Sequence, residues 1–323
     1  MLLLRYFILQ ILWGGSMIRA VITGGSGFIG QALTIHLLSL GWAVTAVVRK
    51  AEKLAHLKRQ ELEVVEADLS HYNSLSNPIA HKADYFFHLA WDGLTPETYS
   101  EQGRQLENVS ASLQALEAAN ALSCRKFIFL GSAYELQVPC DTSNGALPSA
   151  RAPYAIAKLC AAQMCLHRSQ QLDLQFNHVL PTGVFGPGDR SHRAPNTVIS
   201  AFLSGKAPAQ LISADTPQDW LYIKDLLRML TAVAQQGRPY RSYYLGHTVP
   251  TTFGNIITTI RDLLLPEAPL QFGTMPDPTA ATLREISHTA LLEDTGVKAD
   301  YPFDQAILET ASYLRSHPLE LSA

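Results

Sequence analysis

The stretch VITGGSGFIGQAL, residues 21–33, decides the fold of this chain. It begins in a short apolar run that is typical of a buried strand and continues into a helical pattern over 28–39. Gly24, Gly27 and Gly30 stand at the turn between the two. Glycine lets a backbone approach a pyrophosphate closely, and a helix N-terminus attracts that anion. A tight turn without a ligand is the alternative, but the context of strand, turn and helix favours a dinucleotide site.

Similar apolar, β-branched or aromatic runs recur on either side of this stretch. They predict strands buried on both faces of a parallel sheet, over 18–23, 43–48, 62–67, 85–90, 126–131 and 174–180. Helical patterns separate several of them, most clearly over 28–39 and 106–120, and Pro153 suits the first turn of another helix. This alternation predicts βαβ units and an α/β fold with a doubly wound, Rossmann-like parallel sheet.

The rhythm changes after residue 180. The Gly- and Pro-rich segment 181–196 predicts a loop that leads into a different region. Helices are expected over 196–204, from about 224, over 252–264 and over 302–315, and short strands near 209–213 and 242–246. We therefore expect a dinucleotide-binding domain over 17–180, with contributions from about 215–265. Residues 181–323 are expected to form mainly a smaller, substrate-binding cap.

Composition limits the class of protein. With 323 residues, 47% of them hydrophobic and 16% charged, the chain is long and apolar enough for a sizeable globular core. A net charge of -3 argues against nucleic acid as a partner. The cysteines, Cys124, Cys140, Cys160 and Cys165, form no metal-binding motif, so we expect no metal and reduced thiols in the cytoplasm. Residues 1–16 are apolar but too short for a confident membrane span, and we expect a disordered or non-native extension and no membrane partner.

Basic residues end the second predicted strand. An acidic residue about 20 positions after the glycines would accept a hydrogen bond from a free ribose 2′-hydroxyl, whereas Arg49 and Lys50 stand there. Two cations suit a 2′-phosphate, so NADP(H) is favoured over NAD(H). A solvated pair at a strand end is the alternative. Asp68 follows the third strand, where its carboxylate is placed to accept from an adenine amino group or to form a surface turn.

Tyr154 and Lys158 stand four apart on the helix that begins near Pro153, so their side chains share a face. A nearby ammonium lowers the pKa of a phenol from about 10, which would make Tyr154 a proton donor. An ordinary amphipathic helix is the alternative interpretation.

The motifs TGGSGFIG, ADL, FFHLAW, FIFLGSAYE, YAIAK, VFGPGD and DWLYIKDL occur in order over residues 17–316. Together they resemble the extended short-chain dehydrogenase/reductase family of nucleotide-sugar epimerases, dehydratases and ketoreductases. The resemblance implies that Ser132, Tyr154 and Lys158 are catalytic. Tyr154 would protonate the developing alkoxide, Ser132 would donate to the same oxygen, and Lys158 would lower the pKa of Tyr154 and hold the nicotinamide ribose.

The resemblance also implies a set of cofactor contacts. These are Gly24, Gly27, Phe28, Ile29, Gly30, Arg49, Lys50, Asp68, Leu69, Leu89, Ala90, Tyr154, Lys158 and Pro181. It places Asn108 on a helix packed under the site. For His88 we expect a packing or hydrogen-bonding role rather than a catalytic one.

Departures from the family pattern narrow the reaction. Ala133 and Tyr134 stand where the family's dehydratases carry Asp-Glu, so dehydration is not expected. Together with Arg49, this favours an NADPH-dependent reductase, and the segments around 86–99 and 107–119 look most like reductases of 4-keto-6-deoxy nucleotide sugars. The alternatives are a nucleotide-sugar 4-epimerase with tightly bound NAD, a carbonyl reductase of non-sugar substrates and a non-catalytic NADP-binding regulator.

The expected substrate side is less regular. Gln218, Leu180 and Gly183 replace residues that are usual in nucleotide-sugar enzymes, and Gln218 stands where an Arg grips the diphosphate. Arg190, Arg193, Lys206 or Arg284 would have to supply the charge. Trp220 either stacks on a base or packs in the core. The substrate-binding candidates are Trp91, Tyr134, Arg193, Gln218, Trp220 and Arg284, and a homodimer is expected through helices 106–120 and 152–168.

Overall fold

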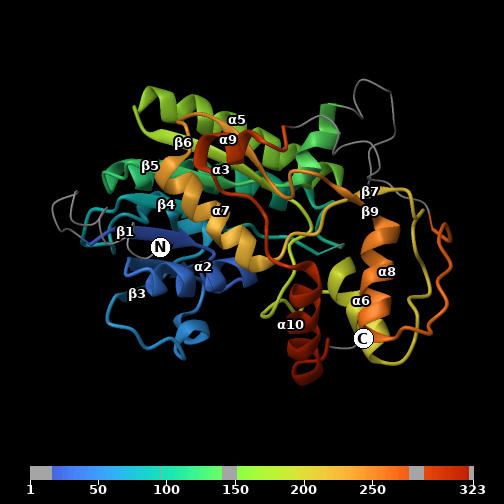
Figure 1. Ribbon diagram of the computed structural model, residues 1–323. Coiled ribbons are helices and arrows are strands. Elements are labelled where there is room, and N and C mark those ends of the chain that lie inside the picture. Colours follow the sequence, from blue (N-terminus) through green and yellow to red (C-terminus); the bar gives the residue numbers. More distant parts are fainter. Residues whose placement is uncertain (1–16, 96, 140–150, 276–286, 320–323) are drawn as a thin grey trace.

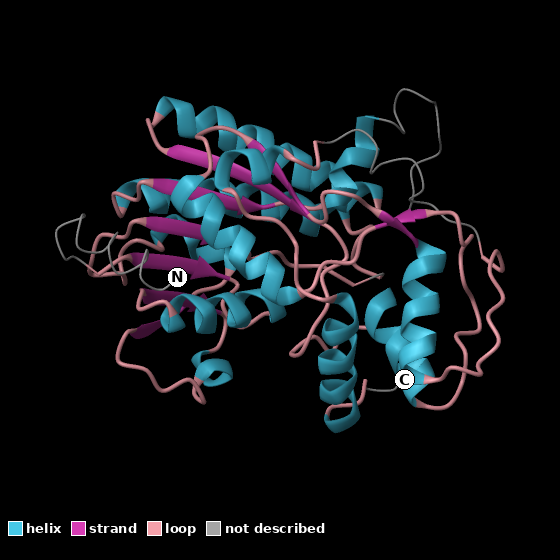
Figure 2. Ribbon diagram, in the orientation of Figure 1, coloured by secondary structure: helices cyan, strands magenta, loops and turns pink. Residues whose placement is uncertain are grey.

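The computed structural model describes residues 17–95, 97–139, 151–275 and 287–319. Its centre is a seven-stranded sheet in the order β3-β2-β1-β4-β5-β6-β8, with every pair parallel (Figures 1 and 2). The strands are β1 (Arg19–Thr23), β2 (Ala43–Val48), β3 (Leu62–Glu66), β4 (Tyr85–His88), β5 (Lys126–Leu130), β6 (Gln175–Pro181) and β8 (Ser242–Leu245). The predicted doubly wound α/β fold is therefore confirmed.

Helices cover both faces of the sheet. The strands are continuous apolar runs, so the side chains on each face of the sheet are apolar and must be buried. Ala20 and Ile22 of β1 pack with α2 (Phe28–Ser39) and α7 (Ile223–Gln236). Val21, which lies between them, packs on the opposite side with the other two long helices, α3 (Gln102–Ala121) and α5 (Ala152–Gln171). The remaining short elements on this half are η1 (Ala51–Leu54), η2 (Leu69–Ser74), η3 (Ala133–Leu136) and α9 (Ala290–Thr295).

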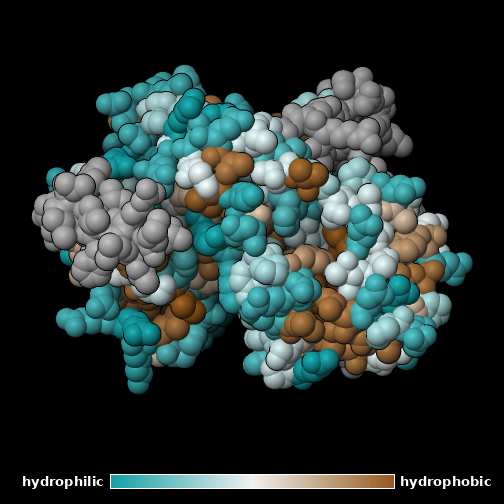
Figure 3. Space-filling view, viewed as in Figure 1, coloured by the Kyte–Doolittle hydropathy of each residue, from teal (hydrophilic) through white to brown (hydrophobic). Residues whose placement is uncertain are grey.

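A second group of helices lies beyond the carboxyl ends of the strands (Figure 1). It consists of α6 (Ala194–Leu203), α8 (Phe253–Leu264) and α10 (Phe303–Ser316), beside a small antiparallel pair, β7 (Pro217–Gln218) and β9 (Thr251–Thr252). In the space-filling view a notch beside α10 separates this group from the sheet region (Figure 3). Ligands of open parallel sheets bind at the carboxyl edge of the strands, which this group faces.

The expected strand near 209–213 is wrong. Leu211 and Ile212 do accept backbone N–H bonds from Thr274 and Gly273. However, the Leu211 N–H donates to the Thr274 side-chain hydroxyl, 2.9 Å away, rather than to a backbone carbonyl. A ladder needs alternating backbone pairs, so this segment stays irregular although Leu211 is buried. The strand of this region is β7, a few residues later.

None of the helices in the described ranges is both long and apolar enough to cross a bilayer. Residues 1–16, Cys140 and Arg284 lie outside the described part of the chain. Within it, no group of three or more His, Cys, Asp or Glu side chains is arranged to hold a metal ion.

Candidate active site

The glycine turn between β1 and α2 has the geometry of a phosphate cradle. Gly24 has φ +73°, and a Cβ added there would come within 2.9 Å of the Ala90 backbone nitrogen. A Cβ on Gly30 would overlap the carbonyl of Gly24. α2 begins after Gly27 with no side chain capping its first N–H groups. These uncapped donors and the close backbone packing fit the pyrophosphate of a dinucleotide.

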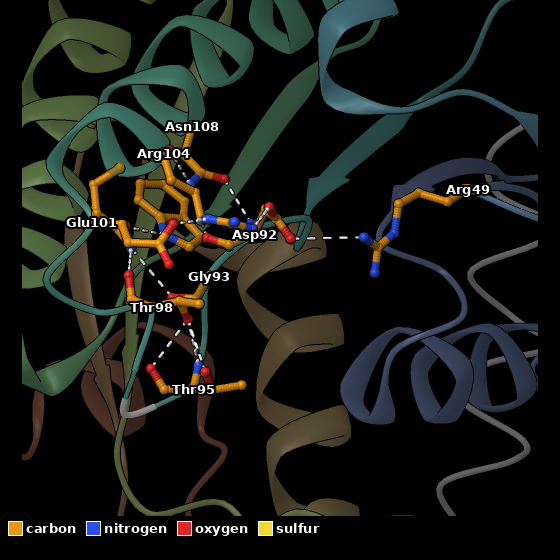
Figure 4. Close-up of polar contacts among 10 residues, drawn as sticks. Arg49, Asp92, Gly93, Thr95, Thr98, Glu101, Arg104 and Asn108 are labelled. Atoms are coloured by element: carbon orange, nitrogen blue, oxygen red, sulfur yellow. Dashed lines mark hydrogen bonds and ion pairs between the residues drawn. The ribbon is translucent and has the colours of Figure 1, made fainter.

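Arg49 follows β2 at one end of this turn. Its side chain is 71% exposed, and its guanidinium lies 3.7 Å from the carboxylate of Asp92, which follows β4. Figure 4 shows Arg49 reaching Asp92 from the other side of the site. Lys50 points to Glu52 at 3.9 Å. Arg49 also borders a cavity of about 390 Å³ beside β2 and β3, whose other lining residues are Glu66, Ala67, Asp68, His71, Ser74, Leu75 and Pro78.

Asp68 forms a local turn at the edge of this cavity. Its carboxylate accepts from the backbone and hydroxyl of Ser70 at 3.0 and 2.6 Å and lies 2.7 Å from His71 Nδ1. These hydrogen bonds lower the pKa of Asp68, and the bond from the Ser70 hydroxyl has the largest effect. Asp68 therefore caps η2, and Leu69 is the first residue of that turn.

The structure brings Ser132 and Tyr154 together. Ser132 caps η3 directly after β5, and Tyr154 lies in the first turn of α5, 7% exposed. Burial raises the pKa of the Tyr154 phenol, while the hydrogen bond with Ser132 acts in the opposite direction. The phenol is therefore protonated over the whole neutral range, in contact with the hydroxyl expected to assist it.

Lys158 lies one turn further along α5 and is 3% exposed. Its ammonium donates to the Leu130 carbonyl at 2.6 Å and lies 3.9 Å from the centre of the Trp91 ring. Burial lowers the pKa of Lys158 to about 7. In this structure the Lys158 ammonium is directed at the Leu130 carbonyl and the Trp91 indole, and burial dominates the pKa of the Tyr154 phenol. That Lys158 lowers the pKa of Tyr154 therefore stays a prediction.

Aromatic rings enclose Tyr154. Trp91 meets it edge to face, with ring centres 6.1 Å apart, and Tyr99 lies 5.1 Å away. Arg151 lies over the rings of Tyr99 and Tyr134, at 5.7 and 5.0 Å, and donates to the Tyr134 hydroxyl at 2.7 Å. Of these residues, Trp91 and Tyr134 were predicted from the sequence and Tyr99 and Arg151 were missed.

A signal for Arg151 was present in the sequence. Arg151 is the N-cap residue of α5, where a cation opposes the helix dipole and cannot accept from the free N–H groups. A residue in a locally unfavourable position is a candidate for a functional role.

The loop that carries Trp91 is held by α3 (Figure 4). Asn108 accepts from the Asp92 N–H at 2.7 Å and donates to the Asp92 carbonyl at 2.9 Å. Arg104 donates to the Asp92 carboxylate at 2.6 Å. The Trp91 indole donates to Gln105 at 2.8 Å. Side chains of α3 therefore hold Trp91 beside Tyr154, by hydrogen bonds to Trp91 itself and to the next residue, Asp92.

His88 has the packing role that was expected. It is buried, with Nδ1 2.8 Å from the Thr23 hydroxyl and Nε2 3.0 Å from the Ser112 hydroxyl. Burial lowers its pKa to about 3, so the imidazole is neutral. It ties β4 to β1 and α3.

The expected substrate residues are more scattered. Trp220 is buried in the core, edge-on to Phe253, so stacking on a base is not what this side chain does here. Gln218 belongs to β7, where it pairs with Thr251. Arg193 bonds Ser191 and Asp189, at 2.9 and 3.2 Å, within its own loop. Pro181 is the last residue of β6.

A pair of a buried Asp and a half-buried His beside β8 was also missed. Asp219 follows β7, and its carboxylate accepts from Tyr244 at 2.7 Å and from the backbone of His247 at 2.8 Å, with His247 Nδ1 at 2.6 Å. The bond to Asp219 raises the pKa of His247. The signal was Asp219 in the DWLYIKDL motif, which contributes to the family resemblance but for which no role was predicted.

Comparisons with known proteins agree with this geometry. The NAD dependent epimerase/dehydratase family matches residues 20–246. The chain is 23% identical over 314 residues to a UDP-glucose 4-epimerase of Mycolicibacterium smegmatis, covering 92% of this chain and 99% of that protein. It is 23% identical over 309 residues to a GDP-6-deoxy-D-mannose reductase of Pseudomonas aeruginosa, covering 90% and 94%.

Among solved structures, a UDP-N-acetylglucosamine 4-epimerase from Methanobrevibacter ruminantium superposes with a TM-score of 0.78 at 23% identity, covering 94% of this chain and 99% of that one. Such a likeness supports the fold. The family match spans the glycine turn, the Ser132, Tyr154 and Lys158 cluster and the strand that closes the sheet. The chain belongs to the NAD dependent epimerase/dehydratase family and is an enzyme of the NAD(P)-dependent oxidoreductase type.

Proposed function

We propose that this protein reduces a keto group on a nucleotide-activated sugar, a 4-keto-6-deoxy sugar, with NADPH as the reductant. The observation that carries the proposal is the contact between half-buried Ser132 and buried Tyr154, with Ala133 and Tyr134 directly after Ser132. A proton donor is present, but the two positions after Ser132 hold no carboxylate for the removal of water. The likeness to a GDP-6-deoxy-D-mannose reductase supports the same reaction.

The side chains fit the protonation half of such a reduction. Burial keeps Tyr154 protonated, so it is ready to donate to a carbonyl oxygen as negative charge develops there. Ser132 donates to the same oxygen from a fixed position at the N-cap of η3. A bound nicotinamide supplies the hydride. The enclosure of Tyr154 by Trp91 and Tyr99 excludes water from the phenol.

The preference for NADPH rests on Arg49 and Lys50. Both side chains are about 70% exposed and follow β2, and Arg49 lines the cavity that Asp68 borders. Their ion-pair partners, Asp92 and Glu52, lie 3.7 and 3.9 Å away, long enough for a 2′-phosphate to compete for the cations.

A nucleotide-sugar 4-epimerase is the second candidate. The similarity to a UDP-glucose 4-epimerase extends over 99% of that protein, so it includes the substrate-binding half. An epimerase of this kind returns the hydride to the same sugar and retains its NAD.

One experiment separates the two. Purified protein is denatured and its released nucleotide is measured, and the protein is then assayed for NADPH consumption against a panel of 4-keto and 4-hydroxy nucleotide sugars. A reductase releases little nucleotide on denaturation. With a 4-keto substrate it consumes about one molecule of NADPH for each molecule of product formed. Stoichiometric NAD, with interconversion of 4-hydroxy sugars and no net NADPH loss, would identify an epimerase and overturn the proposal.

Two variants test the role of Tyr154 in the same assay. Tyr154→Phe removes the phenol, and we expect kcat to fall about 100-fold or more. Tyr85→Phe is the matched control, because Tyr85 is also buried but lies at the amino end of β4, away from the site. A Tyr154→Phe enzyme as active as the wild type would show that the proton comes from elsewhere.

We further propose a homodimer in the cytoplasm. Leu106 of α3 and Ile156 and Met164 of α5 are 66%, 51% and 46% exposed on the two helices that cover one sheet face. A second copy of the same helix pair would bury them. Buried, reduced thiols at Cys124 and Cys165 agree with a reducing compartment.

A further inference from the structure

The Lys158 ammonium is buried against aromatic rings. Lys158 is 3% exposed, and in the described part of the chain its ammonium makes one hydrogen bond, to the Leu130 carbonyl at 2.6 Å, and no ion pair. The ammonium lies 3.9 Å from the centre of the Trp91 ring and 5.1 Å from that of Phe129. An ammonium has three N–H donors, and a buried cation needs compensation for the water it loses. The electron-rich faces of these two rings are therefore the partners left for the other N–H groups, and Trp91 is the nearer.

The buried carboxylate of this region is engaged elsewhere. Glu135 Oε1 accepts from the Ser132 N–H at 2.6 Å, and Oε2 lies 3.0 Å from His178 Nε2. The charge of Glu135 favours the protonated form of Lys158, but both of its oxygens contact these other groups. The contact partners of the ammonium are thus one carbonyl and two rings.

Trp91 is itself held in place by Gln105 of α3. The indole N–H donates to Gln105 Oε1 at 2.8 Å. Gln105 is 1% exposed, and its Nε2 donates to the backbone carbonyls of Gly93 and Thr98 at 3.2 and 3.1 Å. Because both N–H groups of this amide bond to carbonyls, its oxygen must face the indole. A buried side chain therefore fixes the orientation of the Trp91 ring.

The same ring contacts the proposed proton donor. Trp91 meets Tyr154 edge to face, with ring centres 6.1 Å apart and ring planes at 90°. Tyr154 and Lys158 stand four residues apart on α5, one helical turn. One indole, held from α3, thus borders both members of the pair.

We propose that Trp91 is a positioning residue whose indole face serves as the counter-charge of the buried Lys158 ammonium and holds it one turn from Tyr154. Trp91 then acts through Lys158 and not through contact with the substrate. The inference rests on the proposed function only where turnover is measured, since the contact between ring and ammonium is a property of the protein alone.

The first test needs neither cofactor nor substrate. The free energy of unfolding is measured by urea denaturation at pH 6, below the pKa of Lys158 of about 7, for the wild type, Trp91→Leu, Lys158→Met and the double variant. We expect the fall in the folding equilibrium constant of the double variant to be about 5- to 30-fold smaller than the product of the two single falls. A double variant within about twofold of that product would overturn the proposal.

Fluorination separates charge from packing. Fluorine atoms withdraw electron density from an indole ring and change its shape little. Tryptophans with one to four fluorine atoms are introduced at position 91 alone, and stability is measured at pH 6. We expect the folding equilibrium constant to fall stepwise with the number of fluorine atoms. This series also decides the question if Trp91→Leu does not fold, because the fluorinated rings are nearly isosteric with the native one.

Two control series accompany it. The same fluorinated residues at position 91 of Lys158→Met protein should give no stepwise fall, because the cation is gone. Nor should they at position 220, where Trp220 packs in the core against Phe253. A flat series in the wild-type background, or an equally steep one in Lys158→Met, would contradict the proposed contact.

Turnover distinguishes positioning of Lys158 from binding of substrate. With the nucleotide sugar identified by the assay above, kcat and KM are measured for Trp91→Leu and Trp91→Phe. We expect kcat of Trp91→Leu to fall about tenfold or more with KM within twofold of wild type. Trp91→Phe, which keeps an aromatic face, should recover much of the lost kcat. A rise in KM with unchanged kcat would assign Trp91 to the substrate and overturn the proposal. If no nucleotide sugar is turned over, the proposed function fails, and the two stability tests still decide the role of Trp91.

Discussion

The guanidinium of Arg49 and the carboxylate of Asp92 lie 3.7 Å apart across the carboxyl end of β1. Arg49 follows β2 and Asp92 follows β4, and both strands pair with β1. The ion pair therefore crosses the edge from which the glycine turn leaves. Figure 4 shows Arg49 directed at Asp92. Arg104 holds the other oxygen of Asp92, so the carboxylate is fixed while the exposed Arg49 is free to exchange partners.

Replacing Arg49 tests the choice of cofactor. Arg49→Ala removes the cation proposed to bind the 2′-phosphate, and we expect the Kd of NADPH to rise about 10- to 100-fold, with little change for NADH. Fluorescence titration of both nucleotides checks this. Asp92→Asn is the companion variant: it frees Arg49 from its competitor and should tighten NADPH binding. Equal loss of both nucleotides in Arg49→Ala would show that Arg49 does not read the phosphate.

Gly30 tests the phosphate cradle. A Cβ at this position meets the Gly24 carbonyl, which is backbone and cannot turn away. Gly30→Ala should therefore cost about 1–3 kcal/mol of unfolding free energy and weaken dinucleotide binding. Gly103→Ala is the control, because nothing lies within 4 Å of that site on α3, and it should be neutral or stabilising by about 0.5–1 kcal/mol. Chemical denaturation measures both, and equal stabilities would contradict the crowding.

Arg151 tests the substrate side of the pocket. Among the described residues it has no carboxylate partner, and its guanidinium is held between Tyr99 and Tyr134. We expect it to contact an anionic or hydroxyl oxygen of the substrate, so Arg151→Gln should raise KM about tenfold or more and leave the Kd of NADPH unchanged. Arg125→Gln, which also removes an Arg from a Tyr ring but at the amino end of the sheet, should change neither. A normal KM for Arg151→Gln would assign Arg151 to packing alone.

Two apolar side chains test the dimer. Leu106→Glu and Met164→Glu place charges on the face formed by α3 and α5, where both side chains are exposed and Met164 lines a groove of about 520 Å³. Light scattering should give a dimer for the wild type and a mass near 35.5 kDa for the double variant. Leu308→Glu on α10 serves as the control, because Leu308 is 46% exposed, as Met164 is. A wild type that is monomeric at micromolar concentration would end the proposal.

The sequence by itself determined the parts that depend on local chemistry. Strands such as 43–48 are apolar on both faces, the glycines at 24 and 30 leave no room for a Cβ, and a spacing of four places Tyr154 and Lys158 on one helical face. These features follow from backbone geometry and from the periodicity of helices and strands. Both depend only on residues that are close in the sequence.

Only the tertiary structure decided what those residues meet. Glu135 and His178 come from a short turn and a distant strand, and the sheet order brings them together behind Ser132. The contact of the Trp91 ring with the Lys158 ammonium also depends on the tertiary structure, as does the burial of Trp220 in the core. The depth of burial sets the pKa of Tyr154 and Lys158, because desolvation depends on every element packed around a group and not on its neighbours in the chain.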